Sequence, residues 1–136
     1  MRHTRDTFLR LLKDNLASEI PLHNVRRDPQ TPDSNKLRFN AVNVQFLDVA
    51  PDSQVSETQV EIAVIHENEL MAVDWVKQVY SIIWARYFTE RKDYTDPNSP
   101  VNTGMNVYWD RNIRFRSVYS DFYFDYRCLL TLKHTV

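Results

Sequence analysis

The sequence predicts one α+β domain in which an antiparallel sheet of about four to six strands carries two α-helices on one face. Two observations lead to this fold class. Two blocks of the chain have apolar residues at helical spacing, and other blocks alternate between apolar and polar residues with the period of a strand. The predicted order is α-β-β-β-α-β-β. The chain has 136 residues, the length of one domain, so we expect residues 1–136 to form a single unit.

The first helix is predicted from Thr4 to about Ser18. Thr4 is a suitable N-cap, and Asp6 lies near the positive end of the helix dipole. The apolar residues that share one side of this helix are Phe8, Leu9, Leu11, Leu12 and Leu16. Pro21 ends the helix, and a short strand is expected at Leu22–Arg27.

Two extended segments follow, at Leu37–Val49 and Gln59–His66. Apolar residues alternate with polar ones in both, and the phase changes near Ala41, which predicts a bulge or bend there. The polar segment 51–57 joins the two. Because this one segment joins the two strands, we expect an antiparallel hairpin with a long, solvated tip.

A second helix is predicted from Asn68, as its N-cap, to about Glu90. Its apolar residues cover an arc of about 200°, roughly twice the width that a surface helix needs to cover a core. Trp84 and Phe88 lie at the edge of the polar stripe. This helix therefore has more apolar surface than one sheet can cover.

The last block is predicted to be β. Apolar residues alternate up to Trp109, a turn is expected at Asp110–Asn112, and Ile113 and Phe115 continue the pattern. A closing strand of about a dozen residues is roughly twice the usual strand length. Its expected inner face consists of Phe122, Phe124, Tyr126, Cys128, Leu130 and Leu132. The polar segments 28–36, 51–57 and 92–103 are predicted to be loops.

Composition excludes several functional classes. The one glycine, Gly104, is too few for a P-loop or a dinucleotide-binding fingerprint. The one cysteine, Cys128, excludes a disulfide within the chain and a zinc site made mainly of thiolates. The net charge of −1 favours neither a nucleic acid nor an anionic membrane as partner. With no secretory signal pattern and no apolar segment of about 20 residues, we expect no membrane partner.

No arrangement of catalytic or metal-ligating residues is recognisable, so we expect no enzyme activity, no metal and no cofactor. Asp121 and Asp125 are separated by about 13 Å of strand, too far for a glycosidase-type pair. Glu67 and Glu69 are explained by the helix start beside them. Cys128 is expected to be inert on the core face. Metal-ligand spacing is absent among the four histidines, His3, His23, His66 and His134.

A basic cluster consists of Arg111, Arg114 and Arg116, with aromatic residues between and beside them. Single-strand nucleic-acid binders combine cations and rings in this way. Strand alternation, however, places the Phe115 ring inside and the arginines outside. A small nucleic-acid-binding module therefore remains an alternative, and weak contact with non-specific DNA is compatible with the same arginines.

Four segments carry a resemblance to a known family: the opening Thr-Phe-Leu-Arg-Leu-Leu-Lys-Asp helix, the strand pair Ala41–Val49 and Glu57–His66, the helix that begins at Asn68-Glu69, and the closing Phe-Tyr-Phe-Asp-Tyr-Arg-Cys-Leu-Leu-Thr-Leu strand. In this order, over nearly the whole chain, they resemble the tail terminator and tail completion proteins of long-tailed bacteriophages, the group that includes the lambda-type terminator.

The resemblance implies a virion protein, assembled in the host cytoplasm, that forms a ring of typically six copies on the finished tail tube. Such a ring stops tube polymerisation and offers a surface to the head connector. The implied partners are other copies of the chain, the tail tube protein and the head completion or connector protein. A head–tail connector or neck protein is the alternative within the same class.

The resemblance also gives roles to three groups of residues. Ring subunits need interfaces that close by rotation, and the surplus apolar surface at Trp84, Tyr87 and Phe88 is the candidate. The candidate docking loop for the tube or connector consists of Asp52, Ser53, Gln54 and Val55. The candidate DNA-facing residues are Arg111, Arg114 and Arg116. They would need no contacts with bases.

Overall fold

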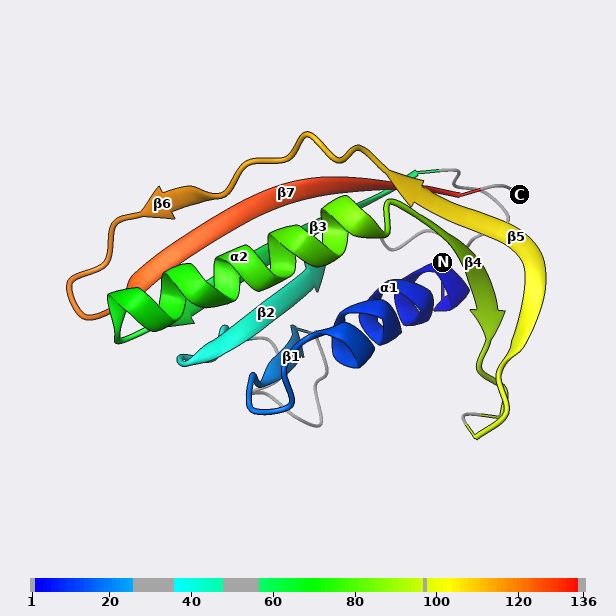
Figure 1. The fold of residues 1–136 in the computed structure, drawn as a ribbon, viewed down its shortest axis with the longest axis horizontal. Coiled ribbons are helices and arrows are strands. Elements are labelled where there is room, and N and C mark those ends of the chain that lie inside the picture. The colour runs from blue at the N-terminus through cyan, green and yellow to red at the C-terminus, as the bar shows by residue number, and fades with distance from the viewer. Residues whose placement is uncertain (1, 26–35, 48–56, 97, 135–136) are drawn as a thin grey trace.

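The computed structural model describes residues 2–25, 36–47, 57–96 and 98–134. Two helices lie against one face of a curled, mostly antiparallel sheet of seven strands (Figure 1), which confirms the predicted α+β fold class. The elements are α1 (Arg2–Asn15), β1 (Leu22–Val25), β2 (Ala41–Phe46), β3 (Glu57–His66), α2 (Glu69–Ala85), β4 (Phe88–Asp93), β5 (Val101–Trp109), β6 (Arg116–Val118) and β7 (Phe124–His134).

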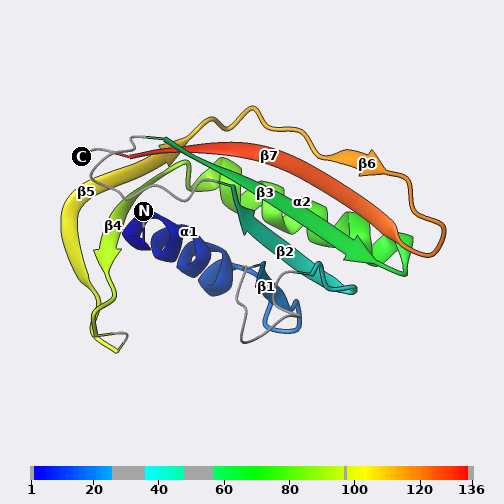
Figure 2. The same ribbon diagram turned by 180° about the vertical axis from the view of Figure 1, so that it is seen from behind.

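The strands are arranged in the order β1-β2-β3-β7-β5-β4, and β6 also pairs with β7. The predicted hairpin of β2 and β3 is confirmed, with Ala41 opposite Ile65 and Phe46 opposite Val60. The pair β1–β2 is parallel. Strand β7 pairs with β3 along one edge, and its other edge pairs with β5 at one end and β6 at the other (Figure 2).

One hydrophobic core lies between the helices and the sheet. The fully buried Phe8 ring of α1 packs edge-on against Phe46 and Trp109, with ring centres 6.3 and 5.5 Å apart. Helix α2 contributes Trp75, Val79, Ile82 and Ile83. The strands contribute the buried side chains Val42, Val44, Val60, Ile62, Val64, Val107, Cys128, Leu130 and Leu132.

The predicted start of the second helix is confirmed, because the side chain of Asn68 accepts a hydrogen bond from the Met71 N–H at 3.1 Å. Its predicted end is wrong. Helix α2 ends at Ala85, and the chain then forms strand β4. No helix in the described part of the chain is long and apolar enough to cross a membrane.

The predicted loop 92–103 is also wrong at both ends, since β4 continues to Asp93 and β5 begins at Val101. Tertiary contacts explain the difference. Strand β4 pairs with β5, and the Lys92 N–H donates to the Thr7 hydroxyl of α1 at 3.1 Å. Gly104, within β5, has a φ of 74°, which glycine adopts without strain. Of the other two predicted loops, residues 28–35 and 51–56 lie outside the described residues.

The sheet has more strands than predicted because β4 and β6 were not expected. Ile113 and Phe115, predicted to lie in a strand, belong to the connection between β5 and β6, yet both pack against the core. The phase change near Ala41 marks the first residue of β2, not a bulge within a strand. Asn40, just before it, has a φ of 56°.

Candidate assembly surface

The indole of Trp109 on β5 fixes the end of helix α2. Its Nε1 donates to the Ile83 carbonyl oxygen at 3.0 Å, and its backbone N–H donates to the Tyr87 carbonyl oxygen at the same distance. Ile83 is fully buried. The neighbouring Trp84, Tyr87 and Phe88 are therefore held at the surface, with 45%, 43% and 57% of each residue exposed. These are the three residues predicted to lie at a subunit interface.

Arg111 lies over two of these rings. Its guanidinium carbon is 4.3 Å from the centre of the Trp84 ring and 4.4 Å from that of Tyr87. A cation over an aromatic face contributes about 0.5–1 kcal/mol at an exposed site. The structure thus places Arg111, which was predicted to face DNA, against Trp84 and Tyr87, which were predicted to contact another subunit. No sequence pattern indicates this contact, because the residues belong to distant elements.

Tyr108 forms an exposed pair with Phe88. It lies opposite Phe88 in the β4–β5 pair and is 39% exposed. Tyr108 was not among the predicted interface residues, although strand alternation indicates its exposure. Val107 and Trp109 face the core, so Tyr108 between them faces away from it. We call these five residues, Trp84, Tyr87, Phe88, Tyr108 and Arg111, the aromatic patch.

Arg114 and Arg116 line a different feature, an open hollow of about 1000 Å³ on the outer face of β3 and β7. The hollow has mixed charge, with Arg127 and Lys133 and also Glu57, Glu61 and Asp110 in its lining. Arg127 donates to the Asp125 carboxylate at 2.9 Å and lies 3.7 Å from Glu61. The hydrogen bond to Asp125 is the main reason that the pKa of Arg127 is raised.

The other predicted site lies outside the described residues. This site is the candidate docking loop, Asp52, Ser53, Gln54 and Val55.

Two of the residues considered as catalytic groups, Asp125 and His66, have structural partners. Asp125 bonds Arg127, and the His66 Nδ1 accepts from the Asn68 N–H at 2.9 Å while its ring packs edge-on against Trp75. Burial raises the pKa of the Cys128 thiol to about 12. Within the described residues, His, Cys, Asp and Glu form no group of three that could hold a metal ion.

A buried polar cluster behind β4 was not predicted. Arg91 is 4% exposed, and its Nη1 lies 3.3 Å from both the Thr4 hydroxyl, to which it donates, and the His134 Nδ1. Its Nη2 contacts the sulfur of Met105. Burial lowers the pKa of Arg91, and burial together with the Arg91 charge lowers the pKa of His134. These contacts join α1 to β4, β5 and β7.

No protein-family model matches this chain, and no curated protein sequence matches it.

Proposed function

We propose that this protein is a structural subunit of a bacteriophage virion. It assembles into a ring, typically of six copies, that terminates the tail tube and joins it to the head connector. The observation that carries the proposal is the aromatic patch, where Arg111 lies over Trp84 and Tyr87 at the end of α2 and the paired residues Phe88 and Tyr108 are exposed on the adjoining β4 and β5. The role requires no catalytic group, metal or cofactor.

The composition of the aromatic patch favours a protein partner. Trp, Tyr and Arg are the residue types that dominate the binding energy of protein interfaces. They carry large apolar areas with polar atoms at their ends, so they tolerate water before assembly and are stabilised by burial afterwards. Because Trp84 and Phe88 belong to rigid elements held by Trp109, little conformational entropy is lost when a partner covers them.

The hollow lined by Arg114 and Arg116 supports a limited role for DNA. Its carboxylates, Glu57, Glu61 and Asp110, offset much of the positive charge. Tight binding of a phosphate backbone needs several uncompensated cations. We propose that these arginines make at most weak, sequence-independent contact with DNA that passes the ring, as phosphate contacts without base contacts do.

A genetic experiment tests the proposal and separates its two forms. In the phage whose genome encodes this chain, a stop codon early in its gene is expected to leave filled heads and unjoined tails in electron micrographs. Overlong tail tubes identify a terminator, because polymerisation then has no stop. Unjoined tails of normal length identify a head–tail connector instead. Normal virions from the mutant contradict both forms.

A further inference from the structure

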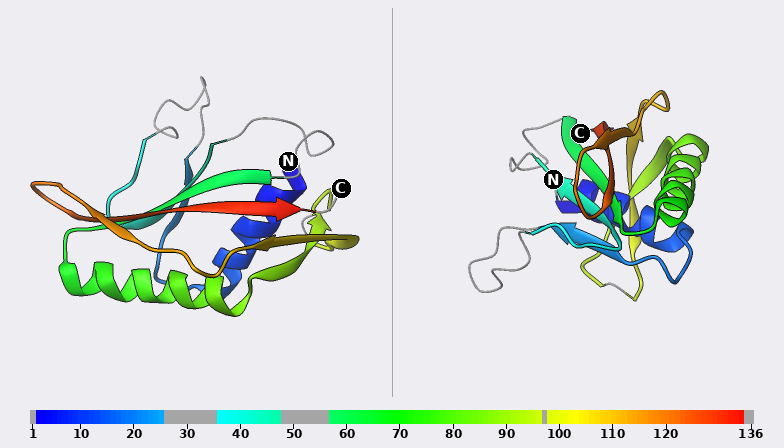
Figure 3. Two further views of the ribbon diagram at one scale, coloured as in Figure 1. Left: turned by 90° about the horizontal axis from the view of Figure 1, so that it is seen from above. Right: turned by 90° about the vertical axis from the view of Figure 1, so that its left-hand side faces the viewer.

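The end of α2 opposite the aromatic patch carries a second exposed apolar surface. In the described chain, the three most exposed large hydrophobic residues are Tyr119 at 87%, Phe122 at 81% and Leu70 at 81%. Tyr119 and Phe122 lie between β6 and β7, and Leu70 lies in the first turn of α2. Figures 1 and 3 show both segments at the same end of the molecule. We call these three residues the apolar tip.

The apolar tip is held in place by local contacts. The Phe39 ring stacks on the Tyr123 ring with centres 3.9 Å apart and planes 2° from parallel. The Tyr119 hydroxyl donates to the Asp121 carboxylate, which raises the pKa of Tyr119. A surface that is ordered before binding loses less entropy when a partner covers it. The tip is therefore suited to docking as a preformed unit.

The charges around the apolar tip are mainly acidic. Glu67, Glu69 and Asp121 are exposed there, and Arg38 on the adjoining loop is the exposed cation beside the Phe39 stack. An acidic surface is repelled by nucleic acid and by anionic lipid. The partner that fits is an aromatic protein surface with positive charge.

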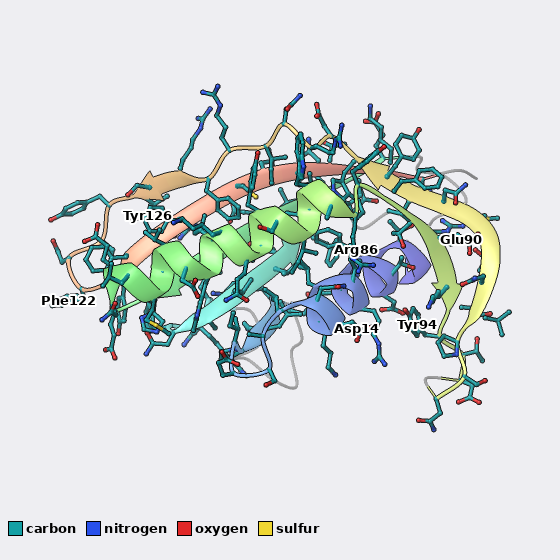
Figure 4. The ribbon with its side chains drawn as sticks, in the orientation of Figure 1. Asp14, Arg86, Glu90, Tyr94, Phe122 and Tyr126 are labelled. Atoms are coloured by element: carbon teal, nitrogen blue, oxygen red, sulfur yellow. The ribbon has the colours of Figure 1, made fainter. Side chains whose placement is uncertain are left out.

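The aromatic patch has that character. Arg111 lies over two of its rings, and Arg86 is exposed at the C-cap of α2, between Trp84 and Phe88 in the chain. Two carboxylates are also exposed nearby: Glu90 on β4, and Asp110, which accepts from the Asn112 N–H at 2.8 Å and lines the hollow with Arg114. Figure 4 shows Arg86 and Phe122 near opposite ends of α2.

We infer that the apolar tip of one copy docks on the aromatic patch of the next copy, with Asp121 and its neighbouring carboxylates facing Arg111. This inference rests on the proposed ring assembly. A contact between two different surfaces is heterologous, and repeated contacts of this kind close into a ring when the rotation allows it. A symmetric contact between two aromatic patches would instead place Arg111 against Arg111, and like charges oppose that arrangement.

Two doubly substituted variants test the inference. Tyr119→Ser with Phe122→Ser removes the tip and keeps the patch, and Trp84→Gln with Phe88→Thr removes the patch and keeps the tip. Each variant alone is expected to be monomeric by light scattering. An equimolar mixture is expected to shift to the mass of two subunits and no further, because one intact tip meets one intact patch. Tyr80→Gln, a matched change of an exposed ring on α2 outside the patch, is expected to assemble like the wild type.

Several outcomes overturn the inference. The mixture of folded variants could remain monomeric, or either variant alone could assemble like the wild type. The wild type itself could also remain monomeric at high concentration. Phe88→Thr alone is the second patch variant if the double substitution fails to fold. The phage experiment separates these failures from failure of the proposed function. If the ring is held by other surfaces, or forms only on the tube, interruption of the gene still leaves unjoined tails.

Discussion

The guanidinium carbon of Arg111 lies 4.3 Å from the centre of the Trp84 ring, so these two residues form one surface. Arg111 comes from the turn after β5, and Trp84 from the last turns of α2. The contact changes the interpretation of Arg111, because a guanidinium stacked on two rings is held in place while its in-plane N–H groups stay able to bind an anionic group of a partner. It also adds a positive charge at the centre of the proposed interface.

Substitution of the aromatic patch should abolish assembly without unfolding the protein. We expect Trp84→Glu and Phe88→Glu each to give a folded monomer, because a carboxylate in a buried apolar contact costs several kcal/mol. Light scattering measures the mass, and circular dichroism checks the fold. Tyr80→Glu is the control, with the same added charge outside the patch. Full assembly of both patch variants would contradict the proposed interface.

The arginines of the hollow should matter little for assembly. We expect Arg114→Ala with Arg116→Ala to form the same oligomer as the wild type and to bind short DNA as weakly, measured by fluorescence anisotropy at about 50 mM salt. A different result would favour the alternative of a nucleic-acid-binding module. In that case the wild type would bind DNA tightly, and either raised salt or the double substitution would abolish the binding.

Phe8 should be among the most important residues for stability. It is fully buried and packs edge-on against Phe46 and Trp109. We expect Phe8→Ala to lower the free energy of unfolding by about 3–5 kcal/mol, through lost burial and a residual cavity. Urea denaturation measures this value. Leu9→Ala, on the partly buried side of the same helix, is expected to cost clearly less, and equal costs would contradict the described core.

His134 should make the protein less stable at mildly acidic pH. Burial and the Arg91 charge lower its pKa in the folded state from the ordinary 6.5. The unfolded chain therefore takes up this proton first, so stability is complete above about pH 6.5 and decreases as the pH falls towards the lowered pKa. Urea midpoints measured from about pH 7.5 to about pH 5.5 are expected to fall more steeply for the wild type than for His134→Gln. Equal slopes would contradict this role.

Local patterns were sufficient to predict the hairpin of β2 and β3, the cap at Asn68 and most of the closing strand. Phe122, predicted on the inner face of that strand, is 81% exposed and precedes β7. Each of the three features depends on neighbours in the sequence: alternation of Val42 and Val44, a side chain that reaches three residues ahead, and one long alternating run. Hydrophobic periodicity and capping are local effects, so the sequence pattern carries them.

The missed features depend on residues far apart in the chain. Strand β4 exists because β5 and the Thr7 hydroxyl satisfy its backbone. Asn43, a polar residue between the apolar Val42 and Val44, is only 1% exposed, and its amide bonds both backbone groups of Arg38 and the Ala63 carbonyl oxygen. The Arg111 contact with Trp84 has the same origin. Tertiary pairing overrides local propensity at each of these places.

We propose that this chain forms closed rings through the apolar tip and the aromatic patch. The most direct test is the mass of the purified wild-type protein by light scattering at high concentration, with negative-stain images of the same sample. We predict one species of several subunits, typically six, that appears as a closed ring and is lost in Trp84→Glu. A monomer at every concentration, or an oligomer that Trp84→Glu leaves intact, would contradict the claim.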